Sequence, residues 1–256
     1  MTNFKLTTLA ALSGLVIAGC LPASVLLTVP GTANVFDAGL GAATAGGTLP
    51  PELDFIPVTG NVLTFQPAPS VFPLPGITGG VQPCAGCIMT TSGDGVNELS
   101  QPPATNISGG TTISGIQYTG DEMFLIGVFL GASLPGTQVA SIGDYGVLGS
   151  GVTPNDATYT PLVGQTFFIG DGLTGTGTGA VQNFIVPEGA TRLFLGFADA
   201  MFFDGQAAMY NDNTGSLAVN LQIMPATIVG TPEPGSMALL VLGLAALAFG
   251  RKKLFA

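Results

Sequence analysis

The chain contains no histidine and no tryptophan, and only five of its 256 residues are Lys or Arg. Without His, a serine nucleophile lacks its usual general base, so serine hydrolase chemistry is not expected. Without Trp, the largest aromatic platform for a pyranose ring is missing. Without a basic patch to meet phosphates, nucleic acid binding is excluded.

Charge is strongly one-sided in the middle of the chain. Residues 34–230 hold fourteen acidic residues and one basic residue, Arg192, for a net charge of −13. Such an excess favours solubility but opposes compactness through self-repulsion, which divalent cations at clustered carboxylates would relieve. Asp121 and Glu122 are adjacent, so on a strand they point to opposite faces and cannot flank one glycosidic bond. We therefore expect that the protein is not an enzyme.

Three cysteines are present, two of them in the short motif Cys84-Ala-Gly-Cys87. In an exported chain a local disulfide between Cys84 and Cys87 is the expected state. A thioredoxin-like redox pair would need a helix start in a βαβ unit, which the pattern does not predict. A zinc site would need two further ligands, which a chain without His does not offer.

The amino end predicts an export signal. Lys5 is the only charge before an apolar stretch, residues 6–17, that is too short to span a membrane comfortably. The small residues at 31–33 predict a signal peptide over residues 1–33. Alternatively, Ile17-Ala-Gly-Cys20 resembles the lipobox of bacterial lipoproteins, which implies that Cys20 is lipidated and becomes the first residue. Both alternatives stay open at this point.

The composition between the two ends predicts one all-β domain over residues 34–227. Gly (39) and Pro (19) are abundant, yet 46% of the residues are apolar, which is typical of many short strands joined by turns. The domain is expected to be an antiparallel β-sandwich. Strands are expected at 53–56, 61–66, 113–119, 123–130, 182–186, 191–198 and 217–223, and loops at 67–83, 90–110 and 173–180.

Oxygen-bearing side chains gather in residues 210–216, directly before the alternating strand 217–223. Asp204 adds a carboxylate at the end of a preceding apolar run. Carboxylates, an amide and backbone carbonyls on adjoining loops are the ligands that a hard cation such as calcium needs. The same residue types are also ordinary in turns, because Asx side chains bond their own backbone.

The segment 204–217 resembles the calcium loop of the bacterial calcium-dependent galactose-binding lectins, whose fold is a jelly-roll β-sandwich. The order of an Asp, a carbonyl ligand, an aromatic residue, two Asx-type ligands and a Ser-containing turn is kept. The spacer after Asp204 is one residue longer, and Asp212 stands where the lectins have Asn. In those lectins sugar hydroxyls complete the calcium coordination, so the resemblance implies a carbohydrate ligand. The residues it implies are Asp204, Asp212, Asn213, Thr214 and the carbonyl of Met209 for the metal, with Asp199 and Tyr210 for ligand contacts and Phe203 as a second aromatic candidate.

The carboxyl end carries the motif Pro232-Glu233-Pro234, then an apolar run at 237–249 and a basic cluster at 251–253. The run predicts a transmembrane helix whose basic end stays in the cytoplasm. This order resembles the PEP-CTERM sorting tail of Gram-negative bacteria, here residues 228–256. The resemblance implies that an exosortase recognises Pro232, Glu233 and Pro234 and cuts the tail, so that Glu233 belongs to a processing site.

Together these features predict a protein that is transiently anchored in the inner membrane and then displayed at the outer surface or in the extracellular matrix. The leading interpretation is a calcium-binding β-sandwich that binds carbohydrate or exopolysaccharide. The alternative is a structural matrix or surface-coat protein in which calcium, if bound, only ties loops together.

Overall fold

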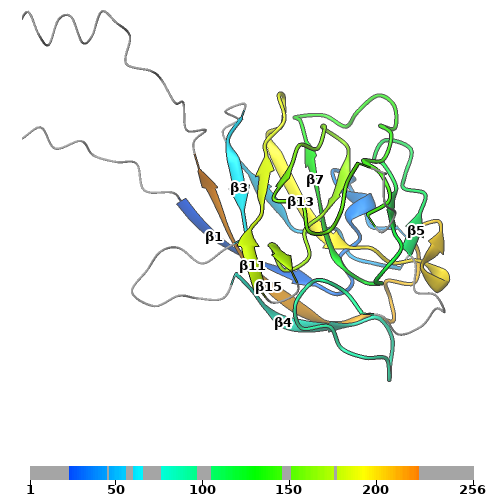
Figure 1. The fold of residues 1–256 in the computed structure, drawn as a ribbon. Coiled ribbons are helices and arrows are strands. Elements are labelled where there is room, and N and C mark those ends of the chain that lie inside the picture. The colour runs from blue at the N-terminus through cyan, green and yellow to red at the C-terminus, as the bar shows by residue number, and fades with distance from the viewer. Residues whose placement is uncertain are drawn as a thin grey trace, which may run out of the picture.

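The computed structural model describes residues 23–44, 46–55, 60–65, 76–96, 105–145, 151–175 and 178–224. These residues form strands and two short 3-10 turns, η1 (Val35–Asp37) and η2 (Met201–Phe203), so the predicted all-β fold class is confirmed (Figure 1). Within this part of the chain, no helix is long and apolar enough to cross a membrane. The helix predicted at 237–249 lies outside the described residues.

The larger sheet is built around β15 (Thr214–Met224), the longest strand of the described chain. One side of β15 pairs with β1 (Ala23–Pro30) over eight residue pairs. The other side pairs first with β4 (Ile77–Gln82) and then with β3 (Val62–Thr64). Beyond β3 the sheet continues with β12 (Asn183–Ile185) and β8 (Thr158–Tyr159), which run parallel to each other.

The second sheet has the order β2 (Glu52–Asp54), β13 (Arg192–Phe197), β7 (Leu125–Leu130) and β9 (Thr166–Phe168), antiparallel throughout. All six residues of β7 are buried, as its continuous apolar run predicts.

The two sheets share one hydrophobic core, and an aromatic cluster fills the space between them. Phe184 of β12 lies at the centre of this cluster. Its ring centroid is 5.3 Å from that of Phe167 on β9, 5.2 Å from Phe65 and 5.1 Å from Tyr159. Offset and edge contacts of this kind stabilise a core beyond the area that they bury.

Two smaller sheets complete the described chain. One contains β14 (Asp204–Gly205), β5 (Thr105–Ile107) and β6 (Ile116–Tyr118), and the other is the hairpin of β10 (Leu173–Gly175) and β11 (Thr178–Val181). Because β14 runs parallel to β5 and β12 parallel to β8, the two sheets that contain these pairs are mixed, whereas the sequence predicted an antiparallel arrangement. The jelly-roll assignment stays a prediction.

Three segments that were predicted as loops contain strands. β4 lies within 67–83, β5 within 90–110, and β10 with part of β11 within 173–180. In β4 the glycines have a packing role: a Cβ on Gly79 would lie 2.3 Å from the Ser216 carbonyl oxygen of β15, and the φ angle of Gly79 is +119°. Here glycine permits close strand contact, whereas the sequence pattern had indicated a turn.

The start of the first described strand, β1, lies beside the end of the last described strand, β15. Ala23 of β1 lies opposite Ile223 of β15, at one side of the molecule, while η2 and β14 lie at the far side (Figure 1). β1 falls within the segment predicted as signal peptide.

Candidate functional site

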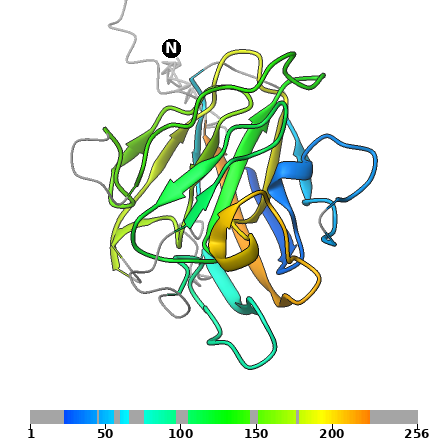
Figure 2. The ribbon, with the colours of Figure 1, turned by 90° about the vertical axis from the view of Figure 1, so that its right-hand side faces the viewer.

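The segment between β13 and β15, residues 198–213, is called the excursion here. It contributes most of the lining of a hollow at the end of the domain where β15 begins. Asp199 follows β13, and an antiparallel bridge between Ala200 and Ala207 closes the loop that carries η2 (Figure 2). The hollow has a volume of about 150 Å³, and its lining includes Asp199, Met209 and Asp212.

The side chains of Asn213 and Asp199 are both buried and bonded to each other. The Asn213 Nδ2 group donates to Asp199 Oδ2 at 2.8 Å and to the Gly31 carbonyl at 3.0 Å. These two hydrogen bonds fix the orientation of the amide. The other amide atom, Asn213 Oδ1, is buried and has no hydrogen-bond partner in the structure.

Asp212 presents a second buried oxygen of this kind, because its Oδ1 also lacks a hydrogen-bond partner. Its main-chain N–H donates to the carbonyl of Met209 at 3.2 Å, and Met209 has a φ angle of +70°. A buried oxygen without a partner is costly, and two on consecutive residues call for an explanation such as a bound ion. A cation bound by both oxygens would satisfy them.

The donor set suits calcium better than zinc. Among the described residues no three carboxylate, thiol or imidazole side chains gather as metal ligands. The hollow is lined by the two carboxylate residues Asp199 and Asp212 and by Met209, whose backbone carbonyl is a further oxygen donor. The amide of Asn213 is bonded to Asp199 beside it, and calcium prefers oxygen donors of this mixture.

Burial also destabilises the charged form of Asp199. It raises the pKa of this carboxyl to about 7; the hydrogen bond from Asn213 offsets part of the rise, and the charge of Asp212 adds to it. Two carboxylates that repel each other in a desolvated hollow would be stabilised by a divalent cation.

Two of the predicted metal ligands lie elsewhere. Asp204 is exposed in β14, where its Oδ1 accepts a hydrogen bond from Asn106 Nδ2 at 3.0 Å, because pairing with β5 directs it there. Thr214 is exposed at the start of β15, with its hydroxyl 3.5 Å from Gln82 Oε1. The structure thus brings together Asp199, Met209, Asp212 and Asn213, and none of the contacts in the described chain joins Asp204 to them.

The aromatic residues predicted to contact a sugar are buried. Tyr210 is 0% exposed and its hydroxyl donates to the Phe197 carbonyl at 2.9 Å, while Phe203 is 3% exposed. Tyr210 is held in the core, whereas Phe203, although buried, contributes to the lining of the hollow, and the ligand contacts of both stay predictions. Phe202, which the sequence did not single out, is 79% exposed and lines the hollow. Its φ angle of +54° is rare for a bulky residue, and such strain tends to occur at functional sites.

A disulfide joins Cys84 and Cys87 in the structure. It closes the turn that follows β4, and Cys84 and Pro83 are among the residues that line the hollow. The disulfide therefore lies in the wall of the candidate site.

A second, smaller hollow of about 90 Å³ is lined by Asp94, Tyr118 and Asp121. Burial raises the pKa of Asp94 to about 6, and the charges of Asp171 and Asp121 contribute to the rise. The oxygens of Asp94 have protein partners, since Oδ1 accepts from the Asp171 N–H at 2.8 Å and Oδ2 from the Ser92 hydroxyl at 3.2 Å. This hollow is therefore a weaker cation site than the one at Asp212.

The raised pKa of Asp94 predicts a pH dependence of stability. Because the folded pKa of about 6 exceeds the ordinary 3.8, the folded protein holds a proton between pH 4 and 6 that the unfolded chain releases. The free energy of unfolding therefore falls as pH rises through this window, by about 1–2 kcal/mol from Asp94 after solvent screening. In Asp94→Asn this part of the decrease in the free energy of unfolding should be lost. Urea unfolding in the presence of chelator at pH 4 and pH 7 will measure it in the variant and in the wild type. Because Asp199 titrates in both proteins, an equal decrease in both would contradict the assignment to Asp94.

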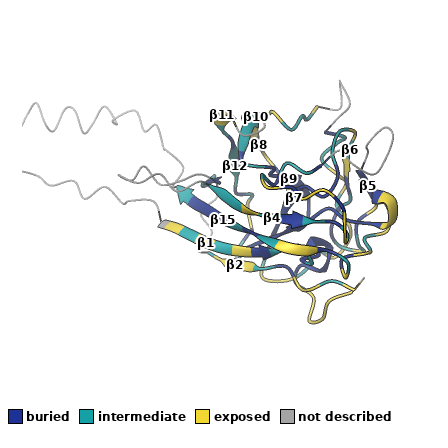
Figure 3. Ribbon diagram, turned by 90° about the horizontal axis from the view of Figure 1, so that it is seen from below, coloured by how far each residue is buried: buried dark blue, intermediate teal, exposed yellow. Residues whose placement is uncertain are grey.

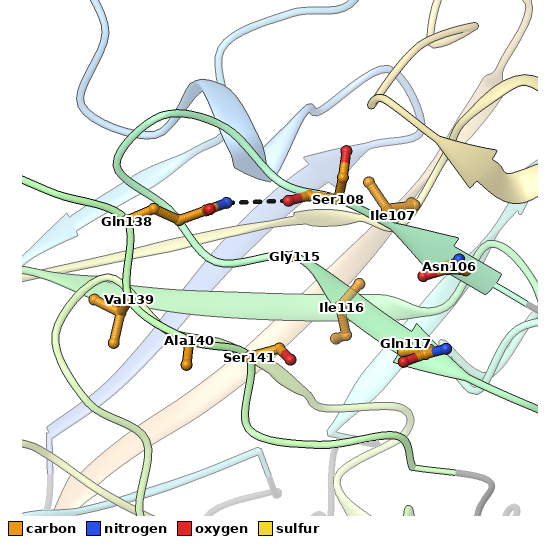
Figure 4. Close-up of a pocket in the computed structure, with 10 residues that line it drawn as sticks. All are labelled: Asn106, Ile107, Ser108, Gly115, Ile116, Gln117, Gln138, Val139, Ala140 and Ser141. Atoms are coloured by element: carbon orange, nitrogen blue, oxygen red, sulfur yellow. Dashed lines mark hydrogen bonds between the residues drawn. The ribbon is translucent and has the colours of Figure 1, made fainter.

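A third hollow is neutral and lined with amides. It has a volume of about 240 Å³ between β5, β6 and the segment 138–141 (Figure 4). Gln138 Nε2 donates to the carbonyls of Ser108 and Ile113 at 3.0 Å each, which fixes that side chain in the wall. This hollow offers hydrogen bonds but no charge.

Residues 231–253 match the PEP-CTERM protein-sorting motif. The sorting tail expected from Pro232, Glu233 and Pro234 is thereby confirmed, and it implies an exported protein that is processed by an exosortase. No curated protein matches the chain, and no solved structure matches it. The resemblance of the ectodomain to the galactose-binding lectins therefore has no support from these comparisons.

Proposed function

We propose that this exported protein binds calcium in the hollow between Asp199 and Asn213. The observation that carries the proposal is the pair of buried oxygens without a hydrogen-bond partner, Asp212 Oδ1 and Asn213 Oδ1, beside the buried carboxylate of Asp199. Asp199 and Asp212 would bind through carboxylates, Asn213 through its amide oxygen and Met209 through its carbonyl.

Calcium would supply positive charge to a pair of neighbouring carboxylates in a very acidic chain. It would neutralise Asp199 and Asp212 and fix the excursion to the start of β15. Calcium takes six to eight oxygen ligands, so four protein donors leave positions for water or for ligand hydroxyls.

The site would face away from the sorting tail. β15 contains eleven residues, which separate Asn213 from the end of the strand by about 35 Å. Residues 225–230 connect Met224 to the motif that begins at 231, and they can reach at most about 25 Å. A protein held by its tail would therefore present the hollow outward, as suits a surface-displayed binding site.

We further propose that the bound calcium receives carbohydrate or exopolysaccharide hydroxyls. Phe202 supports this, because its exposed ring lies at the rim of the hollow and could contact the apolar face of a sugar. The alternative is a structural calcium in a matrix or coat protein. The hydrogen bonds of Asn213 to Asp199 and to Gly31 favour it, since they tie separate segments together at this point.

The test compares the purified exported protein in calcium and in chelator. Calcium is expected to raise the thermal midpoint, and immobilised exopolysaccharide is expected to retain the protein only in calcium. A raised midpoint without retention would assign the calcium a structural role. An unchanged midpoint at millimolar calcium would remove the calcium proposal, and magnesium serves as the control cation because it demands a more regular octahedral geometry.

A further inference from the structure

β1 is an integral part of the larger sheet. It pairs with β15 from Ala23↔Ile223 to Pro30↔Ser216 without a break in register. Figure 3 shows β1 lying beside β15 along the whole strand, with intermediate and exposed residues along its length. Its side chains alternate as those of an edge strand should: Val25, Leu27 and Val29 pack on the core, and Leu26 between them is 69% exposed.

The residues that follow β1 are equally embedded. Ala33 is 0% exposed and Asn34 is 1% exposed. The Gly31 N–H donates to the Gly215 carbonyl at 3.0 Å, and the Ala33 carbonyl accepts from the Phe197 N–H at 3.1 Å. The residues 31–33, whose small size predicts a cleavage site in the sequence, are therefore small because the chain is closely packed here between the two sheets. A Cβ on Gly31 would lie 2.8 Å from the Thr214 carbonyl oxygen.

We propose that export processing leaves β1 on the mature protein and that the leader is removed on the amino side of Ala23. Cleavage after Ala33 would remove the whole edge strand and leave one side of β15 without its ladder. Such cleavage would also take Val29, which is 0% exposed, out of the hydrophobic core. It would also remove the Gly31 carbonyl that holds the amide of Asn213.

The sequence before β1 is sufficient for a leader. Lys5 and the apolar stretch 6–17 supply the charged and hydrophobic parts, and the lipobox-like Ile17-Ala-Gly-Cys20 lies before the strand. The proposal concerns only the position at which the leader is separated from the mature chain, and it does not depend on calcium binding.

The first test is the amino-terminal sequence and intact mass of the protein released by its exporting host. An amino terminus at or before Ala23, acylated or free, supports the proposal. A mature chain that starts at Asn34, or at any residue from 24 to 33, overturns it.

A matched pair of variants gives an independent readout. Val29→Ala removes a core contact of β1, whereas Leu26→Ala changes an exposed side chain of the same strand and the same stretch of leader-like sequence. If β1 is retained, the thermal midpoint of the released protein falls by about 4–10 °C for Val29→Ala and changes by less than about 2 °C for Leu26→Ala. If β1 is removed, both released proteins are identical to the wild type and melt with it. If the Val29→Ala protein does not accumulate while the Leu26→Ala protein does, the amino-terminal sequence of released Leu26→Ala replaces the comparison of melting. A terminus at or before Ala23 then supports the proposal, and a later one overturns it.

Discussion

Asp212→Ala is expected to abolish the stabilisation of the protein by calcium. At a free calcium concentration one hundred times its Kd, binding stabilises the folded state by about 2.7 kcal/mol. For a domain of this size that corresponds to a rise of the thermal midpoint by about 5–10 °C. The variant loses one of two carboxylates and one of two buried oxygens without a partner, so the midpoint should be the same in calcium and in chelator.

The behaviour in chelator distinguishes a metal ligand from a residue with only a packing role. Asp212 Oδ1 has no hydrogen-bond partner, and the charge of Asp212 raises the pKa of the neighbouring Asp199. Its removal relieves both costs, so calcium-free Asp212→Ala should melt no lower than calcium-free wild type. A large loss of stability in chelator would argue that Asp212 supports the loop by itself.

Asp204→Ala is the matched control. It deletes the same chemical group from the same excursion, but the Asp204 carboxylate accepts a hydrogen bond from Asn106 on the paired strand β5, away from Asp199 and Asp212. The calcium response should therefore survive in Asp204→Ala. Loss of the response in both variants would support the ligand set inferred from the sequence, which contains both Asp204 and Asp212. Loss in Asp204→Ala alone would show that Asp212 is not a ligand and that the hollow at Asp199 is not the site.

Strands with an unambiguous pattern were predictable from the sequence. The apolar run of β7 and the alternation of β15 appear in the structure where their residues place them. β1 was not recognised, because Ala23–Pro30 continues the apolar character of a leader, and the alternation of its packed and exposed side chains is not matched by an alternation of residue types. β4 was missed for the opposite reason: its two glycines indicate a loop until the Ser216 carbonyl of β15 is known to lie against them.

The candidate site was only partly predictable for a related reason. Asp212 and Asn213 lie next to each other in the sequence, so a local pattern brings them together. Asp199 reaches them only through the closure of the excursion by the Ala200–Ala207 bridge, and Gly31 through the pairing of β1 with β15. Phe202 and Phe203 both have positive φ angles, and Phe202 is exposed whereas Phe203 is buried; two adjacent phenylalanines in the sequence give no signal of either.

Glu233→Gln is expected to leave the sorting tail attached. In wild type the exported protein should lose the region that follows Pro232-Glu233-Pro234, so its mass falls by that of the tail and it leaves the membrane fraction. If the exosortase reads the carboxylate of Glu233, the amide variant keeps the apolar run 237–249 and stays with the membrane. Intact mass and fractionation of the cells measure both effects, and the expected change is from complete processing to little or none.

The chain supplies its own control for this experiment, because Glu188 also follows a proline. Pro187-Glu188 lies in a turn of the folded domain that the hydrogen bond from the Ala190 N–H to the Pro187 carbonyl closes, and Gly189 stands in place of the second proline. Glu188→Gln makes the same change without touching the motif at 231–253, so its processing should equal that of the wild type. Normal processing of Glu233→Gln would show that the prolines and the apolar run suffice for recognition. Loss of processing in both variants would point to a folding requirement.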